Sequence, residues 1–315
     1  MRKGLFFLPL LLLSARFADA QQDPQFTQYM FNTLYYNPAF SGVDGVTKFT
    51  AVHRSQWLGY APTVGSGGAP TTQMITFTTP LFKQNSGVGA YIVRDELGAQ
   101  TNLEAQVSYA YHLAVKDGKL SLGLRTGVYS QTIDWSKYIA IDRGDPLLLE
   151  GTPTSQQRLD LAAGAFFRKE KYYAGLSFNH LTKANFDFDV GQRSALQTHM
   201  YFTGGYFYEV NFDLKFQFTT LVKTDFTKTT FDVGGIAHIK DTMWGGLSFR
   251  QSEAAILLLG YSFLKDKSLK LGYALDYVIK DQQAKQPTSH EFMLTYELPV
   301  TTVGKKVVRT PRYRH

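Results

Sequence analysis

Alternating apolar and polar positions recur along this chain, and the pattern is clearest in Leu269–Ile279. The odd-numbered residues of this stretch are all apolar or aromatic, and the even-numbered ones are small or charged except for Val278. Because a β-strand turns successive side chains to opposite faces, the stretch predicts a strand with one oily and one polar face. Its length, about 11 residues, suits a tilted strand that crosses a bilayer, whereas strands in soluble proteins typically have about 5–6 residues.

Comparable segments follow one another through the chain and predict an all-β fold, a closed antiparallel transmembrane β-barrel of about 14 strands, an even number as in single-chain bacterial barrels. The predicted strands are Val46–Arg54, Thr71–Thr79, Gly87–Arg94, Thr101–Leu113, Leu120–Gln131, Arg158–Arg168, Tyr172–His180, Leu196–Tyr208, Phe212–Lys223, Thr229–Ile239, Met243–Arg250, Ala255–Phe263, Leu269–Ile279 and Ser289–Leu298.

The lengths of the connections support this order of strands. The three longest, Ser55–Pro70, Asp134–Gln156 and Leu181–Ala195, all fall at odd-numbered places and therefore at one mouth of the barrel. The even-numbered connections are all short. Long extracellular loops and short periplasmic turns are typical of outer-membrane barrels, and long loops on a rigid scaffold usually carry binding. We expect these three loops to face a partner outside the cell.

Inward positions are predicted to be polar, because a charge in mid-membrane on the lipid face costs about 2–4 kcal/mol. The inward set also contains many glycines: Gly123, Gly127, Gly164, Gly205, Gly234, Gly246 and Gly272. Glycine in a strand marks either bending or the close approach of another chain segment. Two interpretations follow, namely curvature of the barrel or room for a plug in the lumen. Opposite charges in the lumen favour a closed barrel over an open diffusion pore.

The N-terminus has the features of an export signal. Arg2 and Lys3 precede the apolar run Leu5–Leu13, and Ala18-Asp-Ala20 resembles a cleavage site. We therefore expect residues 1–20 to be a signal peptide and the mature chain to begin near Gln21. No later apolar run is long enough for a transmembrane helix, and the chain has no cysteine for disulfides or thiolate metal sites.

Few residues of this sequence suggest catalysis, metal binding or nucleic-acid binding. The formal charge of +7 is spread over the chain without the basic stripe that nucleic-acid binding needs. The seven histidines are scattered without metal-ligand spacing, and His112, His199 and His238 are predicted to face the lumen rather than to be catalytic. The sequence predicts no enzyme, no metal and no cofactor.

Two flanking segments, residues 21–44 and 299–315, lie outside the predicted barrel, residues 45–298. The first is aromatic and lacks a strand period, so it packs either as a lid over one mouth or as a plug or docking element in the lumen. The second is basic and should emerge in the periplasm. It is either a disordered tail or a peptide that docks on a periplasmic partner or on anionic lipid head groups.

The aromatic segment resembles the N-terminal signature of the PorP/SprF family, outer-membrane proteins of the Bacteroidetes type IX secretion system. Two shorter matches agree with this resemblance, the run from His53 to Trp57 and the end of the chain. The residues that carry the resemblance are Gln25, Phe26, Gln28, Tyr29, Asn32, Asn37, Pro38, Ala39 and Gly42 in the first motif, Arg54, Gln56 and Trp57 in the second, and Arg309, Pro311, Arg312, Tyr313 and Arg314 in the tail.

The resemblance implies a multi-pass barrel in the outer membrane that delivers or anchors secreted proteins at the cell surface, in some members adhesins of gliding motility. Its implied partners are a secreted surface protein with a C-terminal sorting domain and other type IX secretion components, with the surrounding outer-membrane lipid. The tail residues are expected to make periplasmic contacts. A plugged transporter of hydrophobic solutes, resembling long-chain fatty acid transporter barrels, is the alternative, and a purely structural barrel is a third.

Overall fold

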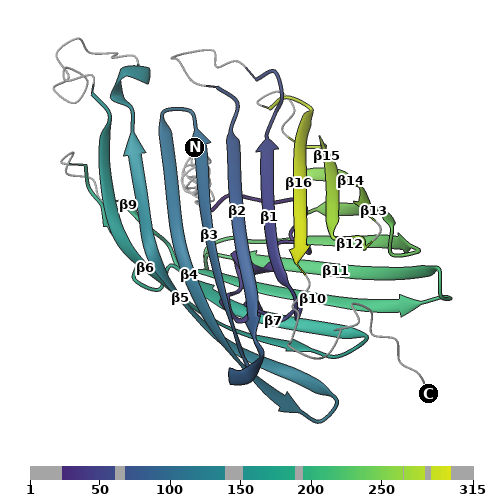
Figure 1. Cartoon of the computed structure of the whole chain (residues 1–315). Coiled ribbons are helices and arrows are strands. Elements are labelled where there is room, and N and C mark those ends of the chain that lie inside the picture. The colour runs from purple at the N-terminus through teal and green to yellow at the C-terminus, as the bar shows by residue number, and fades with distance from the viewer. Residues whose placement is uncertain are drawn as a thin grey trace, which may run out of the picture.

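The computed structural model describes residues 23–60, 68–138, 152–188, 194–264, 266–280 and 285–298. Within these ranges the chain forms a closed antiparallel barrel of fourteen strands, as predicted, and pairing of β1 with β16 closes the sheet (Figure 1). The wall consists of β1 (Thr47–Ser55), β2 (Thr71–Leu81), β3 (Ser86–Leu97), β4 (Gln100–Val115), β5 (Gly118–Ile133), β6 (Thr154–Arg168), β7 (Tyr172–Asn179), β10 (His199–Glu209), β11 (Leu214–Thr224), β12 (Thr229–Ile239), β13 (Met243–Arg250), β14 (Ala254–Phe263), β15 (Leu269–Val278) and β16 (Thr288–Leu298).

The two faces of the wall follow the predicted alternation. In β4, Leu103 and Val107 point outward and are 44% and 58% exposed, whereas the intervening Glu104 points inward and is 2% exposed. The inward placement of His112 and His199 is also observed, since both are buried. An outward ion pair, Arg94 with Glu96, lies near the end of β3 rather than at its middle.

The connections differ at the two mouths. Residues 56–70, 134–153 and 180–198 join strands at one mouth, here called the loop end. Residues 98–99, 225–228, 251–253 and 279–287 also join strands there. The other mouth, here called the turn end, has short connections throughout, at residues 82–85, 116–117, 169–171, 210–213, 240–242 and 264–268. The asymmetry expected from the sequence is therefore present.

Several element boundaries differ from the predicted ones. β4 and β5 extend beyond Thr101–Leu113 and Leu120–Gln131, because backbone pairing continues past the alternating stretch. The connection after β7 contains a small hairpin, β8 (Asn185–Phe186) with β9 (Ser194–Ala195), which the sequence did not indicate. Residue 196, predicted to start the next strand, instead packs its leucine side chain in an apolar cluster with that hairpin.

Phe212, predicted to begin a strand as part of its lipid face, was placed wrongly. It lies in the turn before β11 and is fully exposed. The side-chain Oδ1 of Asn211 accepts hydrogen bonds from the backbone N–H groups of Asp213 and Leu214. Such side-chain turns compete with strand pairing, so the strand begins two residues later.

Residues 23–46, here called the lumen segment, lie inside the wall (Figure 1). The segment contains the short helix α1 (Thr33–Tyr36) and the 3-10 turn η2 (Pro38–Phe40). Its aromatic rings pack edge-on against rings of the wall, as Tyr35 does with Tyr91 at 5.3 Å and Tyr36 with Tyr201 at 5.2 Å between centroids. Fully burying such side chains stabilises a fold by about 1.5–3 kcal/mol each.

None of the described helices has the length and apolar character needed to cross a membrane.

Candidate functional site

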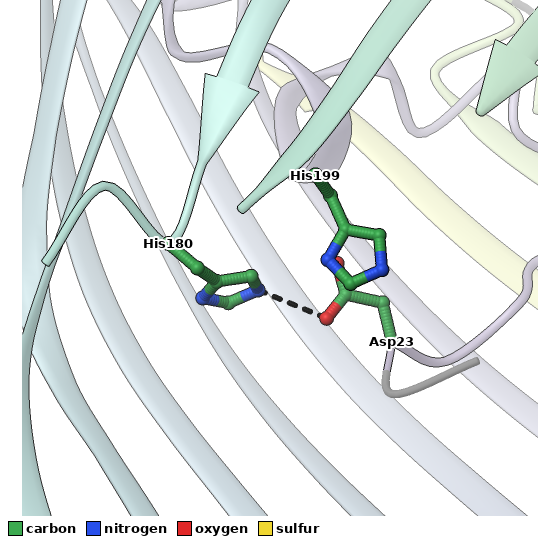
Figure 2. Close-up of side chains that lie close together, drawn as sticks. All are labelled: Asp23, His180 and His199. Carbon is green, nitrogen blue, oxygen red and sulfur yellow. Dashed lines mark hydrogen bonds and ion pairs between the residues drawn. The ribbon is translucent and has the colours of Figure 1, made fainter. Parts of the chain in front are cut away.

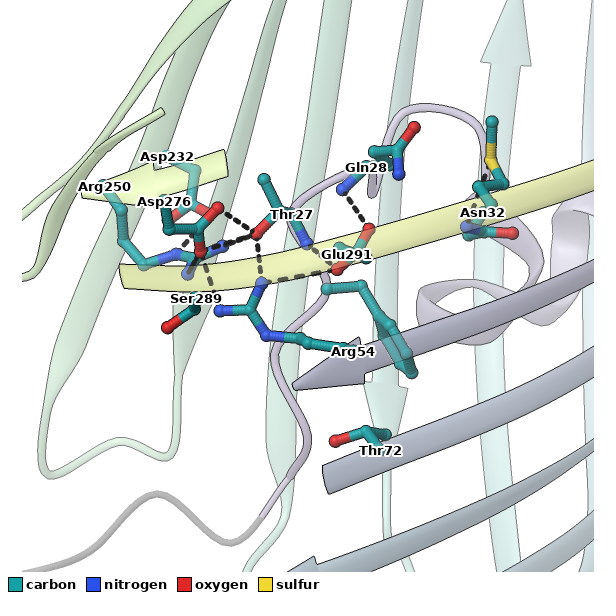
Figure 3. Close-up of polar contacts among 12 residues, drawn as sticks. Thr27, Gln28, Asn32, Arg54, Thr72, Asp232, Arg250, Asp276, Ser289 and Glu291 are labelled. Carbon is teal, nitrogen blue, oxygen red and sulfur yellow. Dashed lines mark hydrogen bonds and ion pairs between the residues drawn. The ribbon is translucent and has the colours of Figure 1, made fainter. Parts of the chain in front are cut away.

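A network of buried charges holds the lumen segment near the loop end of the barrel (Figure 3). Its ionic members come from five strands, namely Arg54 of β1, Asp232 of β12, Arg250 of β13, Asp276 of β15 and Glu291 of β16, and all are at most 2% exposed. Arg54 Nη2 lies 2.7 Å from Asp276 Oδ2, and Arg250 Nε lies 3.0 Å from Asp232 Oδ2. Buried charges are retained only when paired and hydrogen-bonded, and here each has such partners.

Thr27 of the lumen segment lies at the centre of this network. Its hydroxyl donates to the carboxylate of Asp276 and accepts from Arg54 Nη1 at 2.6 Å. The backbone N–H groups of Thr27 and Gln28 donate to the two carboxylate oxygens of Glu291 at 2.7 and 2.8 Å. A carboxylate that accepts two backbone N–H groups forms strong, charge-assisted hydrogen bonds. The network therefore fixes the backbone of the segment as well as its side chains.

The Asn-Pro motif fixes the middle of the lumen segment. The Asn37 side chain accepts a hydrogen bond from the Ala39 N–H, which caps η2, and Pro38 occupies the first position of that turn. The Asn37 Nδ2 donates to the carbonyl of Ala165 at 2.9 Å and faces that of Leu176 at 3.3 Å. One amide side chain thus shapes the local turn and joins it to β6 and β7.

Part of the glycine set faces the lumen segment. A Cβ on Gly123 would lie 2.3 Å from the Ala39 nitrogen, and one on Gly164 would lie 2.2 Å from Asn37 Oδ1. Gly272 is equally close to the Gln28 side chain. These three glycines make room for the segment, and they are joined by three that the sequence reading did not select: Gly87, Gly89 and Gly175.

At the remaining predicted glycines, the atoms nearest to an added Cβ belong to the wall. Gly205 lies under the Tyr173 ring, Gly234 lies beside Ser248, and Gly127 and Gly246 approach neighbouring strands. The small size of these four glycines permits close contacts within the wall. The interpretation as room for a lumen plug therefore applies to Gly123, Gly164 and Gly272, whereas these four glycines serve the wall itself.

At the turn end, the lumen segment is held by neutral hydrogen bonds and by partly exposed ion pairs. The Ser41 hydroxyl lies 2.7 Å from that of Ser108, and the Gly42 N–H donates to Thr78 Oγ1 at 2.8 Å. Asp44 pairs with Lys48 and, at 3.0 Å, with Arg168, whose side chain is 41% exposed. Burial would raise the pKa of Asp44, but these two cations outweigh it and hold that pKa below its usual value. A cavity of about 350 Å³ lies beneath the segment at this mouth and is lined in part by these ionic residues.

The start of the lumen segment meets a group of histidines (Figure 2). Asp23 Oδ1 lies 2.9 Å from His180 Nε2, and His180 Nδ1 lies 3.0 Å from Asp160 Oδ2. Burial would lower the pKa of His180, but the two aspartates outweigh it and raise that pKa well above its usual value. For Asp23 the effect of burial is likewise outweighed by His180 and His199, so its pKa lies below the usual range. Sequence reading placed these histidines apart and missed their convergence.

The residues of the first motif are brought together in the lumen. Phe26, Tyr29 and Asn32 are buried with Gln28, and the Asn32 amide approaches the sulfur of Met293 at 3.7 Å. The side-chain amide of Gln28 and the hydroxyl of Tyr29 have no hydrogen-bond partner among the described residues. Gln25, at the start of the motif, is partly exposed.

The second motif is divided between two places. Arg54 belongs to the buried network, whereas Gln56 and Trp57 lie beyond the end of β1 at the loop end. The Trp57 N–H donates to the Ser289 hydroxyl, and its ring lies under the Lys285 ammonium at 5.3 Å. The tail residues Arg309, Pro311, Arg312, Tyr313 and Arg314, and the expected signal peptide, lie outside the described residues.

The sequence reading missed the network partners Arg250, Asp232 and Glu291. They are far from the first motif in the chain, and only the barrel brings them near Thr27. An inward-facing charge close to the loop end of a predicted strand is the signal that could have identified them, since all three occupy such positions.

Comparison with known families decides the relationship that the motifs suggested. A family model described as type IX secretion system membrane protein PorP/SprF matches residues 18–296, nearly the whole chain. The chain belongs to this family. The expected membership and the outer-membrane location are therefore confirmed. Because periplasmic turns are short in outer-membrane barrels, the turn end of this PorP/SprF barrel faces the periplasm and the loop end faces outward.

Two solved structures resemble the PorP/SprF barrel distantly. A Pseudomonas aeruginosa FadL homologue is 12% identical, with a TM-score of 0.47, over 87% of this chain and 95% of that one. The Acinetobacter baumannii outer membrane protein Omp33 is 7% identical, with a TM-score of 0.44, over 80% of this chain and 99% of its own. These likenesses are too distant to carry an argument about function. Comparison with curated proteins returns no match.

Proposed function

We propose that this protein is a non-conducting barrel that binds and anchors secreted proteins at the cell surface as part of type IX secretion. The observation that carries the proposal is the occupied lumen. Residues 23–46 fill the space between the strands and are fixed there by paired, buried charges from five strands. A pore for small solutes would need that space, whereas a surface anchor needs a rigid frame for its loops.

The loop end is where we place the secreted partner. The strands that the three long connections join end at this mouth, and the wall that they form is continuous from β1 to β16. Long loops on a rigid scaffold commonly form binding surfaces. The partner is a secreted protein with a C-terminal sorting domain, including adhesins of gliding motility, and the family membership supports this choice.

The turn end and the basic tail are where we place the periplasmic machinery. The ionic residues around the cavity at this mouth offer polar contacts, and residues 299–315 add positive charge to the same side. The barrel would then connect a surface protein with components below the membrane without passing solutes.

Site-specific photo-cross-linking in the native host tests this arrangement. A photoreactive amino acid is placed at Leu58 or Thr182, which are exposed at the loop end, and at Glu170, which is exposed at the turn end and serves as the matched control. We expect the first two positions to capture a secreted surface protein and Glu170 to capture a periplasmic component. Capture of neither secreted cargo nor secretion machinery at any position would contradict the proposal.

A second measurement separates the proposal from solute transport. The purified barrel, reconstituted in a planar bilayer, is expected to show no steady conductance, and its loss in cells should leave uptake of hydrophobic solutes unchanged. Ligand-dependent conductance or lost uptake would instead favour a plugged transporter.

A further inference from the structure

Three side chains that the proposed function does not use converge at the start of the lumen segment. Asp23 belongs to that segment, His180 follows β7, and His199 begins β10 (Figure 2). One ligand atom from each lies within 4.8 Å of the others. The His180 Nε2 is 2.9 Å from Asp23 Oδ1, and the His199 Nδ1 is 3.6 Å from Asp23 Oδ2.

The residue types and their spacing suit a zinc-class ion. Imidazole nitrogen and carboxylate oxygen are common zinc ligands, and atoms about 2.0–2.2 Å from a tetrahedral ion lie roughly 3.4 Å apart. The two separations from Asp23 bracket this value. The His199 Nδ1 also lies 3.1 Å from the Gln197 carbonyl, so the His199 ring must turn to present a nitrogen lone pair to the ion. Three protein ligands leave the fourth position to water.

Asp160 provides the support that a metal-bound histidine needs. Its Oδ2 lies 3.0 Å from His180 Nδ1, which leaves the Nε2 of His180 directed at Asp23. A carboxylate on the far nitrogen of a histidine ligand fixes the ring and increases its basicity, as in carboxylate–histidine–zinc triads. Asp160 is itself fully buried and receives the Gln106 amide at 3.2 Å.

The local charge is a second, independent observation. Asp23, Asp160 and Glu104 are all buried, and among the described residues none of them forms an ion pair with a lysine or arginine. The Asp160 Oδ1 also lacks a hydrogen-bond partner within the described part of the chain. His180 and the buried Arg125 offset part of this negative charge, and because buried charge is costly unless it is fully paired, a divalent cation would offset the rest.

We propose that Asp23, His180 and His199 bind a divalent cation of the zinc class, with Asp160 as the positioning residue. The ion ties the start of the lumen segment to the connection between β7 and β10. The inference is independent of the cargo-binding proposal.

Metal titration of the full mature barrel in detergent tests the site. After chelation and dialysis, zinc chloride is added and followed by calorimetry, and cobalt chloride is used for a visible spectrum. We expect one equivalent of zinc per barrel and a cobalt spectrum typical of tetrahedral nitrogen and oxygen ligands. Absence of saturable zinc and cobalt binding to the wild-type barrel would show that the cluster is a hydrogen-bonded network only, and would overturn the proposal.

Matched variants distinguish this site from adventitious binding. His199→Gln should abolish one-equivalent binding, and Asp160→Asn should weaken it by about 10–100-fold, the usual effect of removing a supporting carboxylate. His238→Gln is the control, because His238 also faces the lumen but hydrogen-bonds to Gln217 near the turn end. Heat-modifiable electrophoretic migration verifies that each barrel is folded. Equal loss of binding in the His238 and His199 variants, or unchanged binding in both ligand-site variants, would contradict the assignment.

The stability of the barrel toward urea reports on zinc binding without a calorimetric titration. A cation that binds only the folded state raises the denaturation midpoint with concentration. Zinc should therefore raise the urea midpoint of the wild-type and His238→Gln barrels but not that of His199→Gln. An equal shift in all three would place the ion elsewhere.

Discussion

Near the loop end, the lumen segment is held through Thr27 and Gln28 by fully buried charges from β1, β15 and β16. Near the turn end, the same segment is held through Ser41 and Gly42 by neutral hydrogen bonds and through Asp44 by partly exposed cations. The first kind of contact is costly to break, because each lost partner leaves a charge without solvent. The second kind is cheaper, because a neutral hydrogen bond contributes only about 0.5–1.5 kcal/mol and the ion pair of Asp44 with Arg168 is partly exposed to water. We infer that the loop-end part of the lumen segment is held more firmly than its turn-end part.

Asp276→Ala should have the largest effect on this comparison. It removes the carboxylate that pairs with both Arg54 and Arg250 at the loop end. Breaking a buried pair leaves uncompensated charge, so we expect the free energy of unfolding to fall by about 3–5 kcal/mol, measured by urea denaturation in detergent micelles. The control Asp241→Asn, which removes an exposed charge at the turn end and keeps a side chain that tolerates the positive φ of this position, should change it by less than about 0.5 kcal/mol. An equal loss of unfolding free energy in the two variants would show that the loop end is not held more firmly than the turn end.

Thr27→Val tests the centre of the same network while keeping the shape of the side chain. The hydroxyl lost is the one that joins Arg54 to Asp276. A hydrogen bond to a charged group contributes about 1.5–3 kcal/mol, and we expect a loss of that size in the free energy of unfolding. Thr33→Val is the comparison, since within the described part of the chain the Thr33 hydroxyl hydrogen-bonds only to the Met30 carbonyl, at 3.4 Å. A larger loss there would argue against the central role of Thr27.

Gly123→Ala tests the close approach between the wall and η2. The added methyl would meet backbone atoms of Pro38 and Ala39, which cannot move independently of the turn. Overpacking of this kind costs about 1–3 kcal/mol, and limited proteolysis should cut the displaced segment faster. Gly235→Ala is the matched control because its nearest side-chain atom would be 3.8 Å away. Unchanged protease resistance in Gly123→Ala would show that the segment tolerates a wider spacing.

Asp44→Ala should have the smallest effect. Its partners Lys48 and Arg168 retain access to water at the turn end, and ion pairs of this kind contribute about 0.2–1 kcal/mol. The loss should shrink further at high salt, where exposed charges are screened. A loss as large as that of Asp276→Ala in the same denaturation assay would show that the two ends are held alike.

Much of the wall could be predicted because lipid imposes a period of two on every strand. The alternation in Leu269–Ile279 and the inward placement of Glu104 needed no knowledge of distant contacts. The lumen could not be derived this way, because its contacts join residues far apart in the chain. Thr27 meets Glu291 across a separation of 264 residues, and no local pattern encodes such a pairing. The hairpin of β8 and β9 was missed for a similar reason, since Leu196 packs on it rather than on lipid.

The pairing of β1 with β16 has a consequence for how the molecule is assembled. Arg54 and Glu291 are opposite each other in the register of this pair, and both contact Thr27. The seam that joins the two ends of the sheet is thus also the place where the incoming N-terminal residues are captured. Separation of β1 from β16 would therefore also break contacts of the N-terminal segment, so the closure of the cylinder and the filling of its interior depend on the same two side chains.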